Sequence, residues 1–258
     1  MRQKMRRIDL NADLGEGFGA YTLGNDEALL VVVTSANIAC GFHAGDPGTM
    51  ARTAALAARS HAALGAHPGL PDLCGFGRRR MAVTPEEVRD LVTFQIGALA
   101  GFAARQDQML QHVKPHGALY TQAEEDPAIA AAIAQSVLEY DPALVLVGFS
   151  GGTLVAAGKA LGLQTASEIF ADRAYRPDGT LAPRSQADAV LHSKKQVEAR
   201  VTLWAAEGVL RATDGTALHL AADTICLHGD SPNASALAGV VRQALEAGGF
   251  TVQSLRSP

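Results

Sequence analysis

Short apolar runs alternate with helix-period segments along most of this chain. The first run, residues 7–14, alternates apolar and polar positions, and this period of two predicts a strand. Residues 35–47 are typical of a buried strand that turns into a helix, because Asp46 can cap the helix and Pro47 suits its first position. Further strand-like runs occupy residues 62–66, 109–113, 143–147, 163–169, 224–227 and 250–255.

The segments between these runs carry helix signals. A capping side chain followed by proline marks four helix starts: Asp46-Pro47, Thr84-Pro85, Asp126-Pro127 and Ser231-Pro232. Residues 186–207 are predicted to be mostly helical, and Asp214-Gly215 to form a turn between two short extended pieces.

Strand and helix signals therefore alternate in seven or eight β-α units. Such alternation predicts a parallel sheet with helices outside it. For 258 residues we expect an α/β fold with one domain, residues 1–258. It should be an irregular, TIM-like (β/α) barrel, in preference to an open doubly wound sheet.

Composition narrows the function. A net charge of −4 lacks the basic footprint of a general nucleic-acid binder. Three scattered cysteines do not suit a disulfide framework or a cysteine zinc site, and this favours a reducing cytoplasm. No run reaches the roughly 18 apolar residues of a membrane span, and the basic first residues lack the apolar region of a secretory signal.

Polar residues gather directly after the strand-like runs. Four of the eight histidines do so, namely His43, His67, His116 and His228. The equivalent positions elsewhere hold Asp13, Glu16, Lys114, Glu168, Asp172 and Asp230. One such histidine alone is more often a hydrogen-bonded loop residue than a catalyst. In a barrel, however, all strand ends converge on one face, so we expect these side chains to line a single cleft.

Carboxylates with neutral imidazoles suit either proton transfer near neutral pH or a divalent metal that activates water. A zinc-type site would use two or three of Asp13, His43, His67 and His116, although the chain has no HExxH spacing. Lys114 offers a fixed positive charge for a carboxylate or a phosphate. The run Arg78 to Arg80 suits either a solvated surface or an anchor for an anion.

Residues 148–152 fit the G-x-S-x-G pattern of a nucleophile elbow, and Asp223 and His228 follow in the matching order. No HGGG-type oxyanion segment precedes them, and the other histidines would be left unexplained. We therefore expect Ser150 to cap a helix whose first amides, with Gly151 and Gly152, bind an anion or close the turn.

Eight long segments together closely resemble the LamB/YcsF family, and the resemblance extends over nearly the whole chain. They are residues 9–16, 24–27, 35–47, 65–69, 75–79, 113–120, 170–175 and 226–230. Two departures are Ala12, where a cysteine is common, and residues 186–189, which replace a Pro-Gly version of that loop. The resemblance implies an irregular (β/α) barrel related to polysaccharide deacetylases.

The resemblance also implies an activity. Such a chain would be one component of an ATP-dependent 5-oxoprolinase, a hydrolase that works with subunits B and C and opens the lactam of 5-oxoproline to L-glutamate. ATP, with magnesium, would be a co-substrate, although the chain has no GxxxxGK[ST] phosphate loop. Two alternatives remain open: a stand-alone metal-dependent amide or lactam hydrolase, and a noncatalytic binding subunit.

Site roles follow from this activity. Asp13 or His43 would act as base toward water, while Lys114 and His116 steady the developing or phosphoryl oxygens. The substrate carboxylate would meet Arg173 or the backbone near Gly151. The remaining predicted substrate-binding residues are Asn11, Glu16, His67, Glu168, Asp172 and His228.

Overall fold

The computed structural model of the chain describes residues 6–229 and 233–256. Seven parallel strands close into a barrel in the order β1-β2-β3-β4-β5-β6-β9, and β9 pairs with both β6 and β1. Their bounds are β1 Arg6–Leu14, β2 Ser35–Ala39, β3 Ala63–His67, β4 Leu110–Val113, β5 Val145–Phe149, β6 Gln164–Phe170 and β9 Thr224–Leu227. The predicted (β/α) barrel is confirmed.

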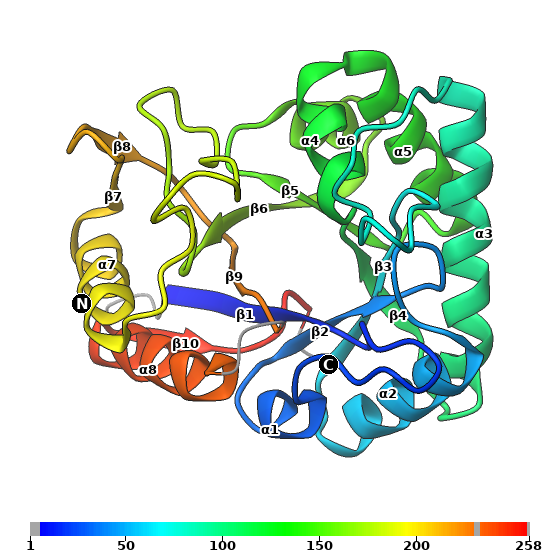
Figure 1. The fold of residues 1–258 in the computed structure, drawn as a ribbon, viewed down its shortest axis with the longest axis horizontal. Helices are drawn as coiled ribbons and strands as arrows, with labels where there is room; N and C mark the ends of the chain where they lie inside the picture. The colour runs from blue at the N-terminus through cyan, green and yellow to red at the C-terminus, as the bar shows by residue number, and fades with distance from the viewer. Residues whose placement is uncertain (1–5, 230–232, 257–258) are drawn as a thin grey trace.

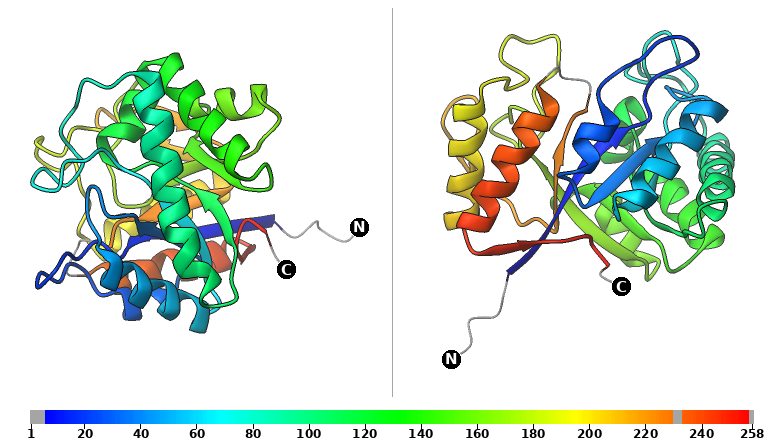
Figure 2. Two further views of the ribbon diagram at one scale, coloured as in Figure 1. Left: turned by 90° about the vertical axis from the view of Figure 1, so that its right-hand side faces the viewer. Right: turned by 90° about the horizontal axis from the view of Figure 1, so that it is seen from below.

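Helices surround the strands on the outside (Figure 1). They are α1 Asp26–Leu30, α2 Pro47–Arg59, α3 Pro85–Ala104, α4 Gly117–Glu125, α5 Pro127–Tyr140, α6 Thr153–Ala160, α7 Lys194–Glu207 and α8 Ala234–Ala247. An eighth sheet strand, β10 Phe250–Val252, lies alongside the beginning of β1 (Figure 2). Within residues 6–229 and 233–256, no helix is long and apolar enough to cross a membrane.

Three of the four predicted helix starts are confirmed. Asp46 accepts hydrogen bonds from the first amides of α2, Asp126 does the same for α5, and Thr84 forms a capping box with Glu87. The fourth, Ser231-Pro232, lies outside the described residues, as does Asp230.

The prediction of a helix from residue 186 is wrong, because α7 begins only at Lys194. The preceding loop is held by tertiary hydrogen bonds instead: the buried guanidinium of Arg173 donates to the carbonyls of Ala182 and Ala189. The two short extended pieces around residues 214–215 are confirmed as the antiparallel strands β7 Val209–Arg211 and β8 Ala217–His219.

Several barrel strands, although not β5, carry buried polar residues that point into the barrel. Asn11 of β1 donates to Glu168 of β6, and Lys114, just after β4, contacts Asp13 of β1, so these contacts cross the barrel between strands that are not neighbours. The buried polar residues on these strands, together with Lys114 just after β4, are Asp9, Asn11, Asp13, Ser35, Asn37, His67, His112, Glu168 and Thr224. Barrels of this type usually fill their interior with branched apolar side chains. Here polar residues of β1, β2, β3, β4, β6 and β9 form a network inside the barrel.

Gly65 shows how tightly this interior is filled. A Cβ at this position would collide with the imidazole of His112 on the neighbouring strand β4. Only a residue without a side chain therefore leaves room for a histidine inside the barrel.

Candidate active site

The carboxyl ends of strands β1 to β4 bring four predicted site residues into one group. Glu16, His43, His67 and His116 each offer a donor atom, and these atoms lie within 4.8 Å of one another. We call these four residues the histidine cluster. Their exposed fractions are 7% for Glu16, 0% for His43, 1% for His67 and 5% for His116. The expected convergence is observed, but the side chains lie beneath the surface instead of lining an open cleft.

Ring packing fixes the arrangement of the cluster. The imidazoles of His43 and His116 are stacked, with centroids 3.7 Å apart and planes 4° from parallel. His67 stands perpendicular to both, at centroid distances of 5.4 Å from His43 and 4.9 Å from His116. A Cβ on Gly69 would lie 2.5 Å from Nδ1 of His43, so the loop after β3 needs a glycine there.

Backbone carbonyls orient two of the three rings. His67 Nδ1 donates to the carbonyl of Lys114 at 2.7 Å, and His116 Nε2 donates to the carbonyl of Phe76 at 2.9 Å. By contrast, neither ring nitrogen of His43 has a hydrogen-bond partner among the described residues. A fully buried ring with two unsatisfied nitrogens is costly for folding, which points to a functional role.

Burial keeps two of these histidines neutral. It lowers the pKa of His43 well below its usual range, and the nearby His67 adds to this effect. Burial likewise lowers the pKa of His116, with further contributions from His43 and His67. Neutral imidazoles offer lone pairs, which can accept a proton or bind a metal.

A second group lies deeper in the barrel, around Lys114. Its Nζ is 3.0 Å from each of Asp13 Oδ1, Glu168 Oε1 and Cys226 Sγ, and 3.3 Å from Asn11 Oδ1. We call these five residues the lysine cluster. The lysine is 1% exposed, so its ammonium is enclosed by its partners.

Charge is compensated inside the lysine cluster. Burial opposes the charged form of Lys114, but Asp13, Cys226 and Glu168 hold its pKa well above its usual range. Burial also opposes ionisation of Asp13, yet His67 and Lys114 outweigh it and hold the pKa of this carboxyl well below its usual range. Burial raises the pKa of Glu168. The cluster therefore contains an ammonium beside the ionised Asp13.

Residues that the sequence did not single out position Asp13. Asn37 donates to Asp13 Oδ1 at 2.8 Å and to Asn11 Oδ1 at 2.7 Å, and it accepts from His112 Nε2 at 2.7 Å. Burial lowers the pKa of His112 to about 3, with Lys114 adding to the effect, so the ring acts as a neutral donor. The sequence signal that could have found Asn37 is a polar residue between the apolar Ala36 and Ile38 of β2.

Asp172 and His228 form a pair at the edge of the site. His228 Nδ1 lies 3.1 Å from both carboxylate oxygens of Asp172, and a donor atom of His228 lies within 4.8 Å of ligand atoms of Asp13 and Cys226. Burial opposes ionisation of Asp172, but His228 outweighs it and lowers the pKa. Two guanidinium nitrogens of the neighbouring Arg173 donate to loop carbonyls. The contact of Arg173 with a substrate stays a prediction.

The prediction that Ser150 caps a helix is wrong. Its hydroxyl donates to the carbonyl of Ala221, and the first amides of α6, those of Thr153 and Leu154, bind the carboxylate of Glu124. Since Glu124 takes these amides, they are not available to an anion. Gly151 lies on an exposed turn, and its role in substrate binding stays a prediction. Among the described residues the G-x-S-x-G pattern forms no nucleophile triad, because the Ser150 hydroxyl binds the carbonyl of Ala221 and His228 pairs with Asp172 instead of Asp223.

Acidic partners take up much of the charge of the arginine run. Arg79 pairs with Asp72, Arg80 pairs with Glu125, and the guanidinium of Arg78 lies 4.7 Å from the ring centroid of Phe76. Phe76 also supplies the carbonyl that orients His116. The run thus fixes the loop over the histidine cluster.

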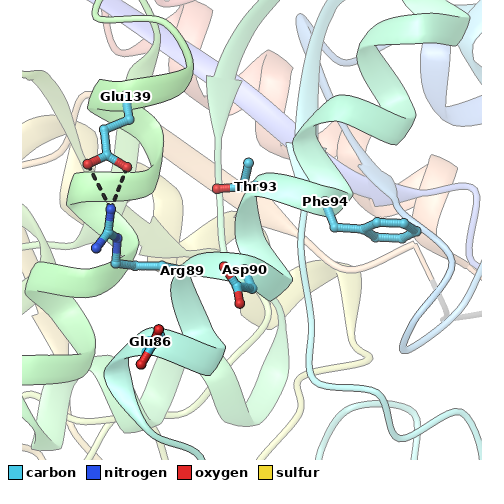
Figure 3. A pocket seen from close by; sticks show the side chains of 6 residues that line it. All are labelled: Glu86, Arg89, Asp90, Thr93, Phe94 and Glu139. Atoms are coloured by element: carbon cyan, nitrogen blue, oxygen red, sulfur yellow. Dashed lines mark hydrogen bonds and ion pairs between the residues drawn. The ribbon is translucent and has the colours of Figure 1, made fainter.

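A separate depression lies on the outer surface, between α3 and α5 (Figure 3). It is lined by Glu86, Arg89, Asp90, Thr93, Phe94 and Glu139, and Arg89 pairs with Glu139 across it. None of the predicted site residues lines this depression.

Comparisons with known proteins agree over the length of the chain. The model of the LamB/YcsF family matches residues 8–258. The A subunit of 5-oxoprolinase from Bacillus subtilis is 53% identical, with 97% of this chain and 98% of that protein covered. The protein of the same name from Methylococcus capsulatus is 55% identical, with 97% and 96% covered. The crystal structure of a lactam utilization protein from Thermus thermophilus superimposes with a TM-score of 0.89 at 44% identity, with 96% and 99% covered.

Proposed function

This chain belongs to the LamB/YcsF family, and we propose that it is the A-type subunit of a 5-oxoprolinase that opens the lactam of 5-oxoproline to L-glutamate. The observation that carries the proposal is identity above one half to relatives named as the A subunit of 5-oxoprolinase, over nearly the full length of both chains. The Thermus thermophilus structure, described as a lactam utilization protein, points to the same substrate class.

The reaction adds water across the C–N bond of a five-membered lactam. The amide is resonance-stabilised, so its carbonyl carbon is a poor electrophile. In the proposed scheme ATP phosphorylates the amide oxygen and leaves as ADP. One water attacks the ring carbon and the C–N bond breaks with proton transfer to nitrogen, which leaves the acyl phosphate of glutamate. A second water then hydrolyses this acyl phosphate, and inorganic phosphate and glutamate are released. The histidine cluster would serve the first water step.

His43 is the better candidate for the base. Its ring is neutral, both nitrogens lack hydrogen-bond partners among the described residues, and Nε2 lies 3.5 Å from Glu16 Oε1. Asp13, the other candidate, already accepts hydrogen bonds from Asn37 and Lys114 on Oδ1, so its charge is compensated within the lysine cluster. We therefore assign proton acceptance to His43 and charge stabilisation of the resulting imidazolium to Asp13.

Lys114 is assigned a positioning role. The ammonium of Lys114 contacts Asp13, Glu168 and Cys226 inside the barrel, so it does not reach a substrate. It holds the side chains of Asp13 and Glu168 in place beside the histidine cluster. The ring of His116 stacks on that of His43 and lies beside the carboxylate of Glu16, so His116 is assigned the role of holding these two side chains in place. ATP with magnesium, subunits B and C as partners, and a cytoplasmic location belong to this proposal as well.

The test is reconstitution. The purified chain is mixed with purified subunits B and C, and glutamate release from 5-oxoproline is followed with and without ATP. We expect release only from the complete mixture with ATP. A parallel mixture with the Bacillus subtilis relative in place of this chain checks that the partners are active.

Two results would overturn the proposal. Glutamate release by the chain alone, without ATP, would make it a stand-alone hydrolase. No release from the complete mixture, when the Bacillus subtilis relative restores activity, would remove the chain from this reaction.

A further inference from the structure

Two ring nitrogens face each other in the histidine cluster. A carbonyl oxygen only accepts hydrogen bonds, so His67 Nδ1 and His116 Nε2, which bind the carbonyls of Lys114 and Phe76, must both carry hydrogens. If neither ring carries a second proton, the other nitrogens, His67 Nε2 and His116 Nδ1, both present lone pairs. They lie 3.0 Å apart. Bare nitrogens at this distance repel unless they share a positive charge, which is either a proton or a metal cation.

A carboxylate completes the arrangement. Oε1 of Glu16 lies 3.5 Å from His116 Nδ1, and all donor atoms of the cluster lie within 4.8 Å of one another. Donor atoms about 2.0–2.1 Å from a tetrahedral zinc ion lie about 3.3–3.4 Å apart, close to the separations of 3.0 and 3.5 Å. Moreover, metal-binding histidines almost always donate their second N–H to a carbonyl or carboxylate, as both rings do here.

Ring geometry separates His43 from the other two histidines. A metal ion lies in the plane of the imidazole that binds it, where the lone pair points. The rings of His43 and His116 are stacked 3.7 Å apart and are 4° from parallel, so an ion in the plane of His116 lies outside the plane of His43. His43 is thus a neighbour of the ion and not a ligand.

The lysine cluster supplies the contrast. Asp13, Cys226 and His228 also bring donor atoms within 4.8 Å of one another. There, however, Lys114 Nζ lies 3.0 Å from both Asp13 and Cys226, so an ammonium already provides the positive charge. The facing nitrogens of the histidine cluster lie beside carboxylate oxygens instead, His67 Nε2 at 3.4 Å from Asp13 and His116 Nδ1 at 3.5 Å from Glu16. These neighbours favour a cation between the two rings.

We propose that His67 Nε2, His116 Nδ1 and Glu16 Oε1 bind a divalent transition-metal ion of the zinc class. Two imidazoles and one carboxylate suit zinc better than magnesium or calcium, which prefer oxygen donors. Three protein ligands leave a fourth position for water, the pattern of zinc sites that do chemistry. The inference rests on this geometry and not on the proposed lactam activity, and it is tested on the chain without partners.

The experiment measures metal content. The purified full chain is stripped with a chelator, dialysed against Zn²⁺ and assayed by elemental analysis, and the affinity is obtained by competition with a chromophoric chelator. We expect one zinc ion per chain. Loss of an outer-shell partner weakens metal binding by about 10–100-fold, so His116→Ala and Glu16→Gln, which remove ligands, should weaken it by more.

His43→Leu is the matched control, since it changes an adjacent buried ring that the geometry places outside the ligand set. It should keep one zinc ion per chain. Glu16→Gln preserves side-chain shape, so a loss of zinc in a folded protein, checked by circular dichroism, is not an effect of unfolding. Three results would each overturn the proposal. The first is no zinc in the unmodified chain, which would mean that the two nitrogens share a proton. The others are an unchanged zinc affinity in Glu16→Gln and His116→Ala, and a loss of zinc in His43→Leu equal to that in these two variants.

Discussion

The lysine cluster and the histidine cluster lie side by side in one barrel but differ in how their charges are satisfied. In the lysine cluster an ammonium contacts two carboxylates and a thiol at 3.0 Å. In the histidine cluster His67 Nε2 and His116 Nδ1 face each other at 3.0 Å, and His43 has no hydrogen-bond partner among the described residues. A satisfied polar network holds a fold in place, whereas unsatisfied buried groups are kept for binding or chemistry. In the proposed function, therefore, the lysine cluster positions and the histidine cluster reacts.

The largest expected effect follows from breaking the satisfied cluster. Lys114→Met removes the cation and leaves Asp13 and Glu168 buried beside each other. Removal of one partner from a buried ion pair costs about 3–5 kcal/mol, and we expect the free energy of unfolding in urea to fall by this amount. The double variant Lys114→Met with Glu168→Gln should recover part of the loss. Unchanged stability of the single variant would show that the lysine cluster does not support the fold.

A smaller effect, on activity, is expected when residues in or beside the histidine cluster are changed. Asp13→Asn removes the charge that stabilises the His43 imidazolium, and His116→Ala removes the ring stacked on His43. Because proton transfer to His43 depends on both, each should lower ATP-coupled glutamate formation in the reconstituted enzyme by at least about 100-fold. The exposed residue His219 offers a control, and His219→Ala should leave turnover unchanged. If both site variants turn over at a near-normal rate at saturation and only their KM rises, the chain binds substrate without catalysing.

Acid should weaken the fold through the buried histidines. His112 stays neutral in the folded protein down to a pKa of about 3, whereas an unfolded histidine takes up a proton near pH 6.5. Between these values the unfolded state binds more protons, so stability falls as the pH falls, by at most about 1.4 kcal/mol per pH unit for each such histidine.

This pH dependence can be measured by urea unfolding between pH 7 and pH 4 with a chelator present. His112→Gln should reduce the slope, and His219→Gln at an exposed position should not. An identical slope in His112→Gln and the unmodified chain would contradict the assignment of His112 as a neutral buried donor.

The smallest effect concerns a turn outside both clusters. Gly151 has a φ of +70°, and alanine there costs roughly 1–2 kcal/mol in the left-handed conformation. Since Glu124 binds the adjacent helix amides, we expect Gly151→Ala to lower stability by that amount and to leave the KM for 5-oxoproline unchanged. A clear rise in KM would instead support the predicted role of Gly151 in substrate binding.

Much of the fold was predictable because its signals are local. The period of two in residues 7–14 and the capping pairs at Asp46, Thr84 and Asp126 specify strands and helix starts without reference to the rest of the chain. The loop before α7 was not predictable, since it is held by Arg173 through contacts that only the folded chain creates.

The candidate site was predictable to the same extent. The barrel hypothesis gathers His43, His67 and His116 at one end, and the structure places them together. The sequence could not reveal that Glu16 Oε1 lies 3.5 Å from His116 Nδ1, that Lys114 is enclosed by Asp13 and Glu168, or that His112 lies over Gly65. These features depend on side-chain directions and on which strands face each other across the barrel.

The division of labour between the clusters is tested most directly by His43→Leu in the reconstituted enzyme. Leucine fills a similar volume and removes two unsatisfied buried nitrogens, so the chain should unfold at the same or a higher urea concentration. Glutamate formation from 5-oxoproline with ATP should nevertheless fall by at least about 100-fold. A stable variant with near-normal glutamate formation would contradict the claim that the histidine cluster is the reactive part of this barrel.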